Sequence, residues 1–239
     1  MKRKQYIKGM IQGIPIFLGY LSVSFGFGIM AVRSGLTVLE ATAMSLFNIT
    51  SAGQAAGVGI IAAHGSIIEM ILAQFTINLR YALMSLSLSQ KLDRTFTTRH
   101  RLSASFGITD EIFALASSQE EPVTPYYMYG LILVSAMGWV LGSFLGSWAG
   151  SILPQAVSDA LGIMLYGMFI AIVVPPAKKE AGVLAAVITA ALLSVIICYL
   201  LPFISSGFSV MICGIAAAAA AALIFPRPAG DAESAGDDA

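Results

Sequence analysis

Long apolar stretches separated by short polar breaks fill most of this sequence. The hydrocarbon core of a bilayer is about 30 Å thick, so a helix needs roughly 20 apolar residues to cross it. Hydropathy along the chain marks stretches of about that length near 9–32, 38–63, 65–89, 126–150, 159–176, 180–200 and 206–225. This pattern predicts an all-α, polytopic helical membrane protein with about seven to eight spans.

Composition and the distribution of charge sharpen this picture. Of the 239 residues, 57% are hydrophobic and 11% are charged, whereas an ordinary soluble domain has about 25% charged residues. A water-soluble globular protein is therefore excluded, and the charge balance gives no indication of a nucleic-acid partner. Four of the thirteen acidic residues fall in the last nine positions. We therefore expect a disordered acidic tail over 227–239, after a single transmembrane domain over 1–226.

Basic residues form three clusters that constrain the topology. The clusters are Lys2, Arg3, Lys4 and Lys8; Lys91, Arg94, Arg99 and Arg101; and Lys178 with Lys179. Short loops rich in Lys and Arg face the cytoplasm, so we expect all three clusters, and both termini, on the cytoplasmic side of a cell membrane. Three full crossings between Gly9 and Ser89 would instead place the second cluster outside.

Two arrangements remove this conflict. Either one of the early segments is broken or re-entrant, or the loop with the second cluster is external and the stretch 104–118 makes a short extra crossing. Both predict broken or re-entrant helices in the first half of the chain. Irregular backbone at membrane depth occurs where it is buried in protein or lines a cavity, and transporters use such breaks as binding sites. The topology conflict therefore points to the functional site.

Polar residues interrupt the stretch 38–63 near its middle. Asn48, Gly53 and Gln54 lie within the sequence NITSAGQAAG. Glycine beside an amide side chain suits a helix that unwinds and leaves donors and acceptors for a ligand. The alternative is helix packing through small residues, with an interhelical hydrogen bond from Gln54. The sequence leaves both interpretations open.

The stretch 65–89 contains the polar residues Asn78 and Arg80. An ionised group at the bilayer centre costs about 2.5 kcal/mol or more, so Arg80 requires a partner or a ligand. Glu69 lies roughly three helical turns away, which is too far for a direct ion pair. The planar guanidinium suits a carboxylate, either that of a substrate or that of Asp110 or Glu111.

Asp110 and Glu111 follow Thr109, a residue type that caps the N-termini of helices. Both acids would then lie in the first turn of a helix, where the macrodipole favours negative charge. That role is a sufficient structural explanation. The functional alternative is proton coupling, in which one carboxyl at a cavity takes up a proton or pairs with the ammonium group of a substrate.

A stripe of small residues runs along the stretch 126–150. Gly138, Gly142, Gly146 and Gly150 recur every four residues, which predicts close packing against another helix of this chain or of a second one. The sequence contains no Walker motif, no HExxH and no GxSxG, and its Cys and His residues lack metal-ligand spacing. We therefore expect no enzyme activity, no cofactor and no metal.

Several short motifs together resemble the AzlC family, in order and in spacing. They are GIPIFLGY (13–20), FGFG (25–28), SAGQ (51–54), NLRY (78–81) and TDEIF (109–113). The resemblance runs from about Gly9 to Phe225. The residues that match the family pattern are Pro15, Gly19, Gly53, Gln54, Asn78, Arg80, Asp110 and Glu111.

The resemblance implies a secondary transporter that exports leucine, isoleucine and valine, with methionine as a further substrate. It also implies a partner, a small AzlD-like membrane subunit. The alternatives to this function are a channel-like facilitator of another small solute and a non-transporting membrane scaffold.

An aliphatic amino acid needs a cationic group for its carboxylate, an acceptor for its ammonium and an apolar wall for its side chain. These requirements assign provisional roles to the polar residues at membrane depth. We expect the substrate to contact Asn48, Gly53, Gln54, Asn78 and Arg80. We expect proton coupling through Asp110 or Glu111. The hypothesis is that the three segments carrying these residues meet at the midplane of the bilayer.

Overall fold

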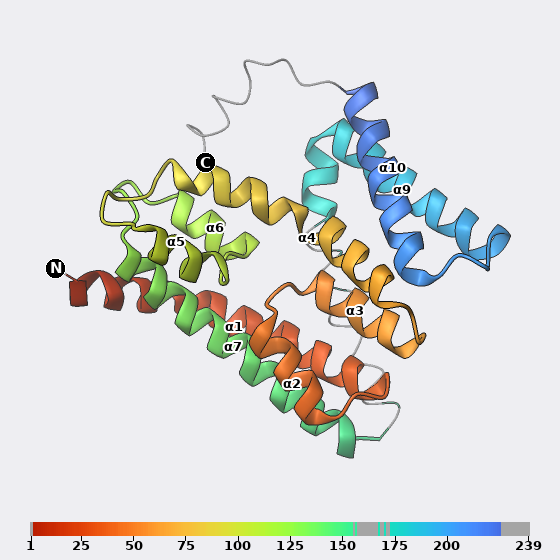
Figure 1. Cartoon of the computed structure of the whole chain (residues 1–239), viewed down its shortest axis with the longest axis horizontal. Coiled ribbons are helices and arrows are strands. Elements are labelled where there is room, and N and C mark those ends of the chain that lie inside the picture. The colour runs from red at the N-terminus through yellow and green to blue at the C-terminus, as the bar shows by residue number, and fades with distance from the viewer. Residues whose placement is uncertain (1, 155, 157–166, 168–169, 171–172, 226–239) are drawn as a thin grey trace. The chain divides into compact units, whose positions relative to one another are not determined.

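A computed structural model describes residues 2–154, 156, 167, 170 and 173–225 of the chain (Figure 1). In this part of the chain the secondary structure is helical, apart from one isolated bridge between Leu92 and Val123. Helices long and apolar enough to cross a membrane are α1 (Lys2–Arg33), α4 (Ile67–Ser89), α7 (Pro125–Ile152), α9 (Ala181–Leu200) and α10 (Ser206–Ile224). The prediction of an all-α, polytopic membrane protein is confirmed.

The chain divides into two compact units. Unit 1 comprises Met1–Val58 and Asn78–Tyr166, and unit 2 comprises Gly59–Ile77 and Gly167–Ala239. A single domain over 1–226 stays a prediction. The acidic tail over 227–239 and most of the span expected over 159–176 lie outside the described residues.

The two longest helices of unit 1, α1 and α7, pack side by side along most of their length (Figure 1). The glycine stripe of α7 faces α1: a Cβ built on Gly138 would lie 2.5 Å from the backbone oxygen of Phe17, and one on Gly150 would lie 3.1 Å from the Cα of Ile29. Near the start of both helices, Gly9 meets the backbone of Tyr127 in the same way. Residue numbers therefore rise together on both helices, so α1 and α7 run parallel.

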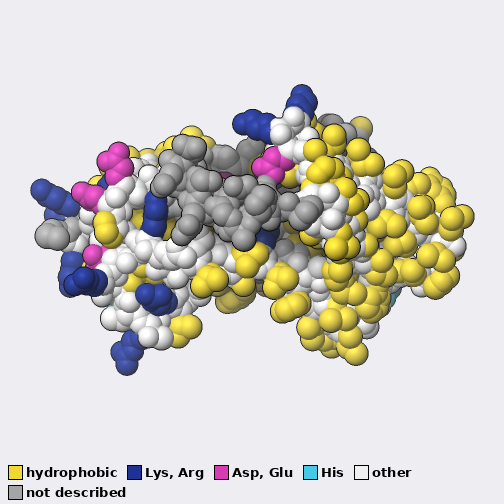
Figure 2. All heavy atoms as spheres, turned by 90° about the horizontal axis from the view of Figure 1, so that it is seen from above, with side chains coloured by type: hydrophobic (Ala, Val, Ile, Leu, Met, Phe, Trp, Pro, Cys, Tyr) yellow, Lys and Arg dark blue, Asp and Glu magenta, His cyan; other side chains and the backbone are white. Residues whose placement is uncertain are grey.

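This parallel packing brings two basic clusters to one end of unit 1. The Lys2 ammonium lies 5.3 Å from the centre of the Tyr126 ring at the start of α7. The loop that carries the second cluster is tied to the same end, because His100 Nδ1 lies 2.8 Å from Tyr129 Oη and the Leu92 bridge joins it to Val123. Figure 2 shows Lys and Arg side chains (dark blue) gathered there. The conflict posed by three full crossings therefore disappears.

The second apolar stretch does not form one continuous helix. This stretch forms two short helices, α2 (Val38–Phe47) and α3 (Ala52–Ala62), with non-helical residues 48–51 between them. Asn48 is extended at φ −148°, and Ser51 has a φ of +45°, in the left-handed region. The prediction of a broken helix in the first half of the chain is thus confirmed.

The stretch 104–118 does not form a single crossing helix. It contains the end of α5 (Thr98–Ser105) and the whole of α6 (Asp110–Ser117). Eight residues of helix span about 12 Å, less than half of the hydrocarbon core. Of the two arrangements that the sequence allows, the structure therefore shows the broken helix. Buried apolar side chains hold this region together, among them Leu88, Phe96, Ile108, Ile112, Met128 and Leu131.

The first helix extends beyond its apolar stretch. It begins at Lys2, about two turns before the apolar stretch that starts near residue 9. Lysine, arginine and glutamine are good helix formers, so the helix continues into the polar N-terminal segment. Hydropathy marks only the part of a helix that suits the membrane interior, so α1 is longer than the apolar stretch within it.

Unit 2 contains a buried carboxylate that the sequence did not single out. Glu69 is 4% exposed, and its Oε1 accepts hydrogen bonds from the Ser205 hydroxyl and from the Gly207 backbone N–H, at 2.5 and 2.9 Å. These donors belong to the N-terminus of α10, where the helix dipole stabilises negative charge. A Cβ on Gly207 would lie 2.6 Å from Glu69 Oε1, so a larger residue there would displace the Glu69 side chain. Glu69 thus fixes the start of α4 to α10, and hydrophobic side chains cover the outer surface of α9 and α10 (Figure 2, yellow).

Candidate functional site

A tyrosine near the middle of the first apolar stretch organises a polar cluster in unit 1. Tyr20 Oη lies 2.5 Å from both Thr109 Oγ1 and Glu111 Oε2. A phenol carries one proton and a carboxylate only accepts, so Tyr20 donates to Glu111 and accepts from the Thr109 hydroxyl. Tyr20 is 7% exposed and Thr109 is 5% exposed. The pair of hydrogen bonds therefore attaches the start of α6 to the middle of α1.

The start of α6 forms as the sequence predicts. Thr109 is the N-cap, and its side chain accepts a hydrogen bond from the backbone N–H of Ile112. Asp110 and Glu111 consequently lie in the first turn, where the four unpaired backbone N–H groups attract negative charge. The cap also directs the two carboxylates to different partners.

The partner of Asp110 is Arg80. The Arg80 guanidinium lies 2.9 Å from Asp110 Oδ2, and both side chains are 43% exposed. The same guanidinium also lies 5.1 Å from the centre of the Tyr81 ring. Burial raises the pKa of the Asp110 carboxyl; the Arg80 guanidinium lowers that pKa and the Glu111 carboxylate raises it further. An ion pair that is nearly half exposed leaves both charges accessible to a ligand.

Gln54 belongs to a second, fully buried network around the break between α2 and α3. Its Oε1 accepts a hydrogen bond of 2.8 Å from Trp139 Nε1, and its Nε2 donates one of 2.9 Å to Ser45 Oγ. Ser45 in turn lies 2.6 Å from Ser143 Oγ on α7. Gln54 is 1% exposed, and both ends of its amide are engaged. In this conformation Gln54 ties α3 to α2 and α7, which is the packing role that the sequence left open.

The two networks meet at an aromatic pair. The rings of Tyr20 and Trp139 pack edge to face with their centres 5.3 Å apart, and Ile49 from the break contacts the same cluster. Tyr20 and Trp139 lie near the middle of the stretches 9–32 and 126–150. The Tyr20 and Gln54 networks thus meet near the middle of α1 and α7.

The remaining expected site residues lie within six positions of Gln54 or Arg80 in the sequence. Asn48 is half-buried at the C-cap of α2, and Gly53 is buried in the first turn of α3. Asn78 is half-buried on α4, two residues before Arg80. In the break itself, Thr50 Oγ1 is buried without a hydrogen-bond partner in the described part of the chain. A buried hydroxyl of this kind is uncommon and marks the break as a place for a polar ligand atom or a water molecule.

Sequence reasoning missed the residues that connect the site. Tyr20 is the last residue of the first motif, but no role was assigned to it from the sequence. Trp139 directly follows the first residue of the glycine stripe and was not assigned a role either. Ser45 and Ser143 likewise carried no expected role, although Ser45 accepts a hydrogen bond from Gln54 and Ser143 lies within hydrogen-bond distance of Ser45. The available signal was the presence of hydrogen-bonding side chains at the centre of an apolar stretch, where an unpaired polar group is costly.

Replacing Trp139 by phenylalanine tests the buried network. The change removes the indole N–H and leaves Gln54 Oε1 without its donor, so we expect a loss of about 1–3 kcal/mol in the free energy of unfolding. The measurement is the midpoint of thermal unfolding in detergent. Trp148→Phe is the matched control, since Trp148 is 55% exposed on the same helix. Equal midpoints for the two variants would contradict the network.

Comparison with known proteins adds a family and several relatives. The family model described as "AzlC protein" matches residues 15–153, a shorter range than the resemblance from Gly9 to Phe225. An "uncharacterized membrane protein" of Archaeoglobus fulgidus is 33% identical over 179 residues, which cover 74% of this chain and 78% of the relative. The inner membrane protein YgaZ of Escherichia coli is 28% identical over 182 residues, which cover 73% of this chain and 74% of the relative.

A more distant relative has a name that includes an activity. The branched-chain amino acid transport protein AzlC of Bacillus subtilis is 22% identical over 170 residues, covering 70% of this chain and 66% of the relative. No solved structure matches the chain.

Proposed function

Because the chain belongs to the AzlC family, we propose that it is a secondary transporter that exports leucine, isoleucine and valine, with methionine as a further substrate. The family is associated with transport, and several relatives are named as membrane proteins. The Bacillus subtilis relative, whose name specifies branched-chain amino acids, supports the substrate class.

The observation that carries this proposal is the exposed ion pair beside the Tyr20 cluster. Arg80 offers a planar guanidinium that suits a substrate carboxylate. Asp110, released from Arg80 when the carboxylate binds, is then available to the substrate ammonium. The helices around it are rich in aliphatic side chains, which suit a branched side chain. Exchange of one ion pair for two between protein and substrate avoids leaving an unpaired charge inside the membrane.

The other expected binding residues surround the break. Thr50, with its buried hydroxyl, supports a role for the 48–54 segment in binding polar atoms of the substrate. Within this proposal Asn48 and Gly53 contribute from the break, and Asn78 contributes from α4. Gln54 acts by holding the break in shape, because its amide is already engaged by Trp139 and Ser45.

Proton coupling through Asp110 or Glu111 supplies the driving force in this proposal. The raised pKa of Asp110 supports it, because such a carboxyl takes up a proton more readily at neutral pH than an ordinary one. A small AzlD-like membrane subunit is the proposed partner, and the proposed location of the protein is the cell membrane. The two basic clusters at one end of unit 1 support a cytoplasmic N-terminus.

Efflux from cells tests the function directly. Cells lacking their own branched-chain exporters are loaded with labelled leucine, isoleucine or valine, and the chain is expressed with and without its small neighbour. We expect efflux at least about tenfold above background, only with both proteins, and abolished by a protonophore. Efflux that ignores the protonophore would indicate a channel-like facilitator. No efflux, with both proteins inserted, would contradict the substrate assignment.

One observation favours a second candidate, a non-transporting scaffold. In that case Arg80 and the acids serve only to neutralise each other, and the structure does pair Arg80 with Asp110. The scaffold differs from the transporter in one measurable respect: its function does not require that the pair carry charge.

A further inference from the structure

A pocket in unit 1 lies between the second basic cluster and the Arg80–Asp110 ion pair. It has a volume of about 250 Å³ and is bounded by the end of α4, the loop after it, α5 and the start of α7. Ser85 and Ile108 both line it. Ser85 lies about 7.5 Å further along α4 than Arg80, and Ile108 lies two residues before Asp110. The pocket and the ion pair are therefore neighbours on the same two segments.

The wall of this pocket is apolar. It is formed largely by Leu88, Leu92, Phe96, Ile108 and Met128. Pockets for drug-sized ligands typically have volumes of about 300–1,000 Å³, so this one suits a smaller molecule. An aliphatic group of a few carbon atoms matches both the size and the wall.

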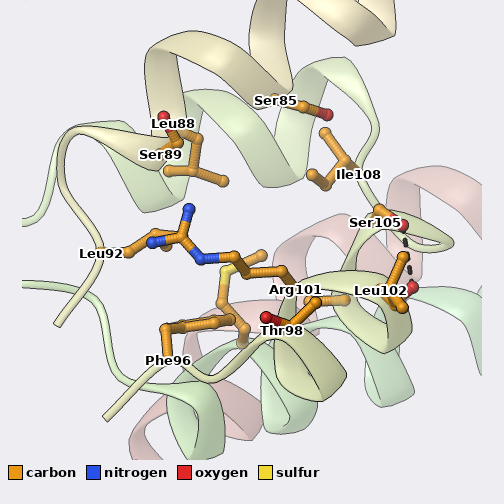
Figure 3. A pocket seen from close by; sticks show the side chains of 12 residues that line it. Ser85, Leu88, Ser89, Leu92, Phe96, Thr98, Arg101, Leu102, Ser105 and Ile108 are labelled. Atoms are coloured by element: carbon orange, nitrogen blue, oxygen red, sulfur yellow. Dashed lines mark hydrogen bonds between the residues drawn. The ribbon is translucent and has the colours of Figure 1, made fainter. Parts of the chain in front are cut away.

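A single cation reaches into the pocket. Figure 3 shows the Arg101 side chain extending across it, with the guanidinium near Leu92 and Ser89. In the part of the chain that the structure describes, the Arg101 guanidinium has no ion-pair or hydrogen-bond partner, and none of the lining residues is acidic. Hydroxyl groups of Ser85 and Ser89 are the other polar groups on that side. The pocket thus offers a site for a carboxylate but no charge for an ammonium.

We propose that this pocket is the site where the chain first receives its substrate from the side of the basic loops, and that it recognises an aliphatic carboxylate without recognising the amino group. This inference rests on the proposed function for its role in transport. Arg101 binds the carboxylate, and the apolar wall takes the branched chain. The amino group of the substrate is then recognised only at the second binding site, the pair of Arg80 and Asp110.

Binding of labelled 4-methylpentanoate to the purified full chain tests the pocket. This probe has the carbon skeleton of leucine without its amino group. We expect saturable binding, competition by leucine at similar concentrations, and no competition by isopentylamine, which lacks the carboxylate. Stronger competition by leucine than by unlabelled probe, by tenfold or more, would overturn the claim that the amino group is ignored.

Arg101→Gln is the decisive variant. Removing a charge-assisted hydrogen bond should weaken probe binding roughly tenfold to a hundredfold. Arg99→Gln is the matched control, since Arg99 lies on the same helix and does not line the pocket. We expect Arg99→Gln to change binding less than twofold. Equal effects of the two variants would show a general charge effect and overturn the proposal.

Two further outcomes separate this inference from its alternatives. Tenfold tighter binding of dodecanoate than of 4-methylpentanoate would identify an acyl-chain site for lipid and contradict the small-substrate assignment. Leucine efflux with an unchanged KM in Arg101→Gln would contradict the pocket's role in transport while the proposed function stands. Arg101-dependent binding of the probe by a chain that exports no amino acid would support the site and contradict the proposed function.

Discussion

Gly146→Ala is expected to destabilise this protein although alanine is the better helix former. A Cβ at Gly146 would lie 2.7 Å from the Cα of Phe25, and that neighbour is backbone that no side-chain rotation can move. The two helices would have to separate along the whole stripe. Overpacking typically costs about 1–3 kcal/mol, and we expect the upper end or more here. The midpoint of thermal unfolding in detergent should fall by roughly 6–12 °C.

Gly214→Ala is the control for this prediction. Gly214 lies on α10, and a Cβ there meets nothing within 4 Å. Replacing glycine by alanine in a helix is then expected to stabilise by up to about 1 kcal/mol. Gly150→Ala should fall between the two, because its Cβ would meet the Cα of Ile29 at 3.1 Å. A Gly146→Ala variant as stable as Gly214→Ala would show that α1 and α7 do not pack through the glycines.

Neutralising both members of the Arg80–Asp110 pair should reduce leucine efflux by at least about tenfold without unfolding the protein. Arg80→Gln and Asp110→Asn each leave one charge unpaired, so each single variant loses both stability and leucine efflux. The double variant leaves a neutral pair, and its unfolding midpoint should return to within about 4 °C of the original, equivalent to about 1 kcal/mol. Its efflux should stay roughly tenfold to a hundredfold low, because the substrate carboxylate has lost its guanidinium.

The double variant separates the two candidate functions. A scaffold requires only that no charge is left unpaired, so recovery of both stability and biological function in the double variant would support the scaffold and contradict the transporter. Arg94→Gln is the control for loss of one positive charge, since Arg94 is exposed in the loop after α4. We expect its efflux to match that of the unaltered chain. Asp110→Asn alone also distinguishes the two coupling candidates: residual efflux that no longer responds to external pH would assign coupling to Asp110, and a retained response would assign it to Glu111.

Local patterns in the sequence predicted the helices, the break and one cap. Hydropathy locates helices because the bilayer demands apolar residues over a fixed length, irrespective of what packs against them. The conflict between basic loops and full crossings indicated a broken helix in the first half, and residues 48–51 form such a break. Thr109 caps α6 as predicted because capping depends only on the residues that immediately follow.

Features that depend on distant residues were beyond local patterns. The glycine stripe shows that a helix packs closely, but nothing in it identifies α1 or a parallel direction. The role of Gln54 depends on Trp139, which lies 85 positions further along the chain. Arg80 had two acidic candidates at adjacent positions, and the geometry of the first turn of α6 assigns Asp110 to Arg80 and Glu111 to Tyr20. These assignments require the fold.

The parallel pairing of α1 and α7 has a consequence for synthesis of the protein. Gly28 packs against Ser143, and Gly9 packs against Tyr127. The ribosome therefore synthesises the packing partner of each glycine about 120 residues after the glycine itself. At translation rates of about 5–20 residues per second, that delay is roughly 6 to 24 s. During this interval α1 sits in the membrane with its small-residue face uncovered. Any lipid, chaperone or insertase that shields this face is therefore expected to act before α7 leaves the ribosome.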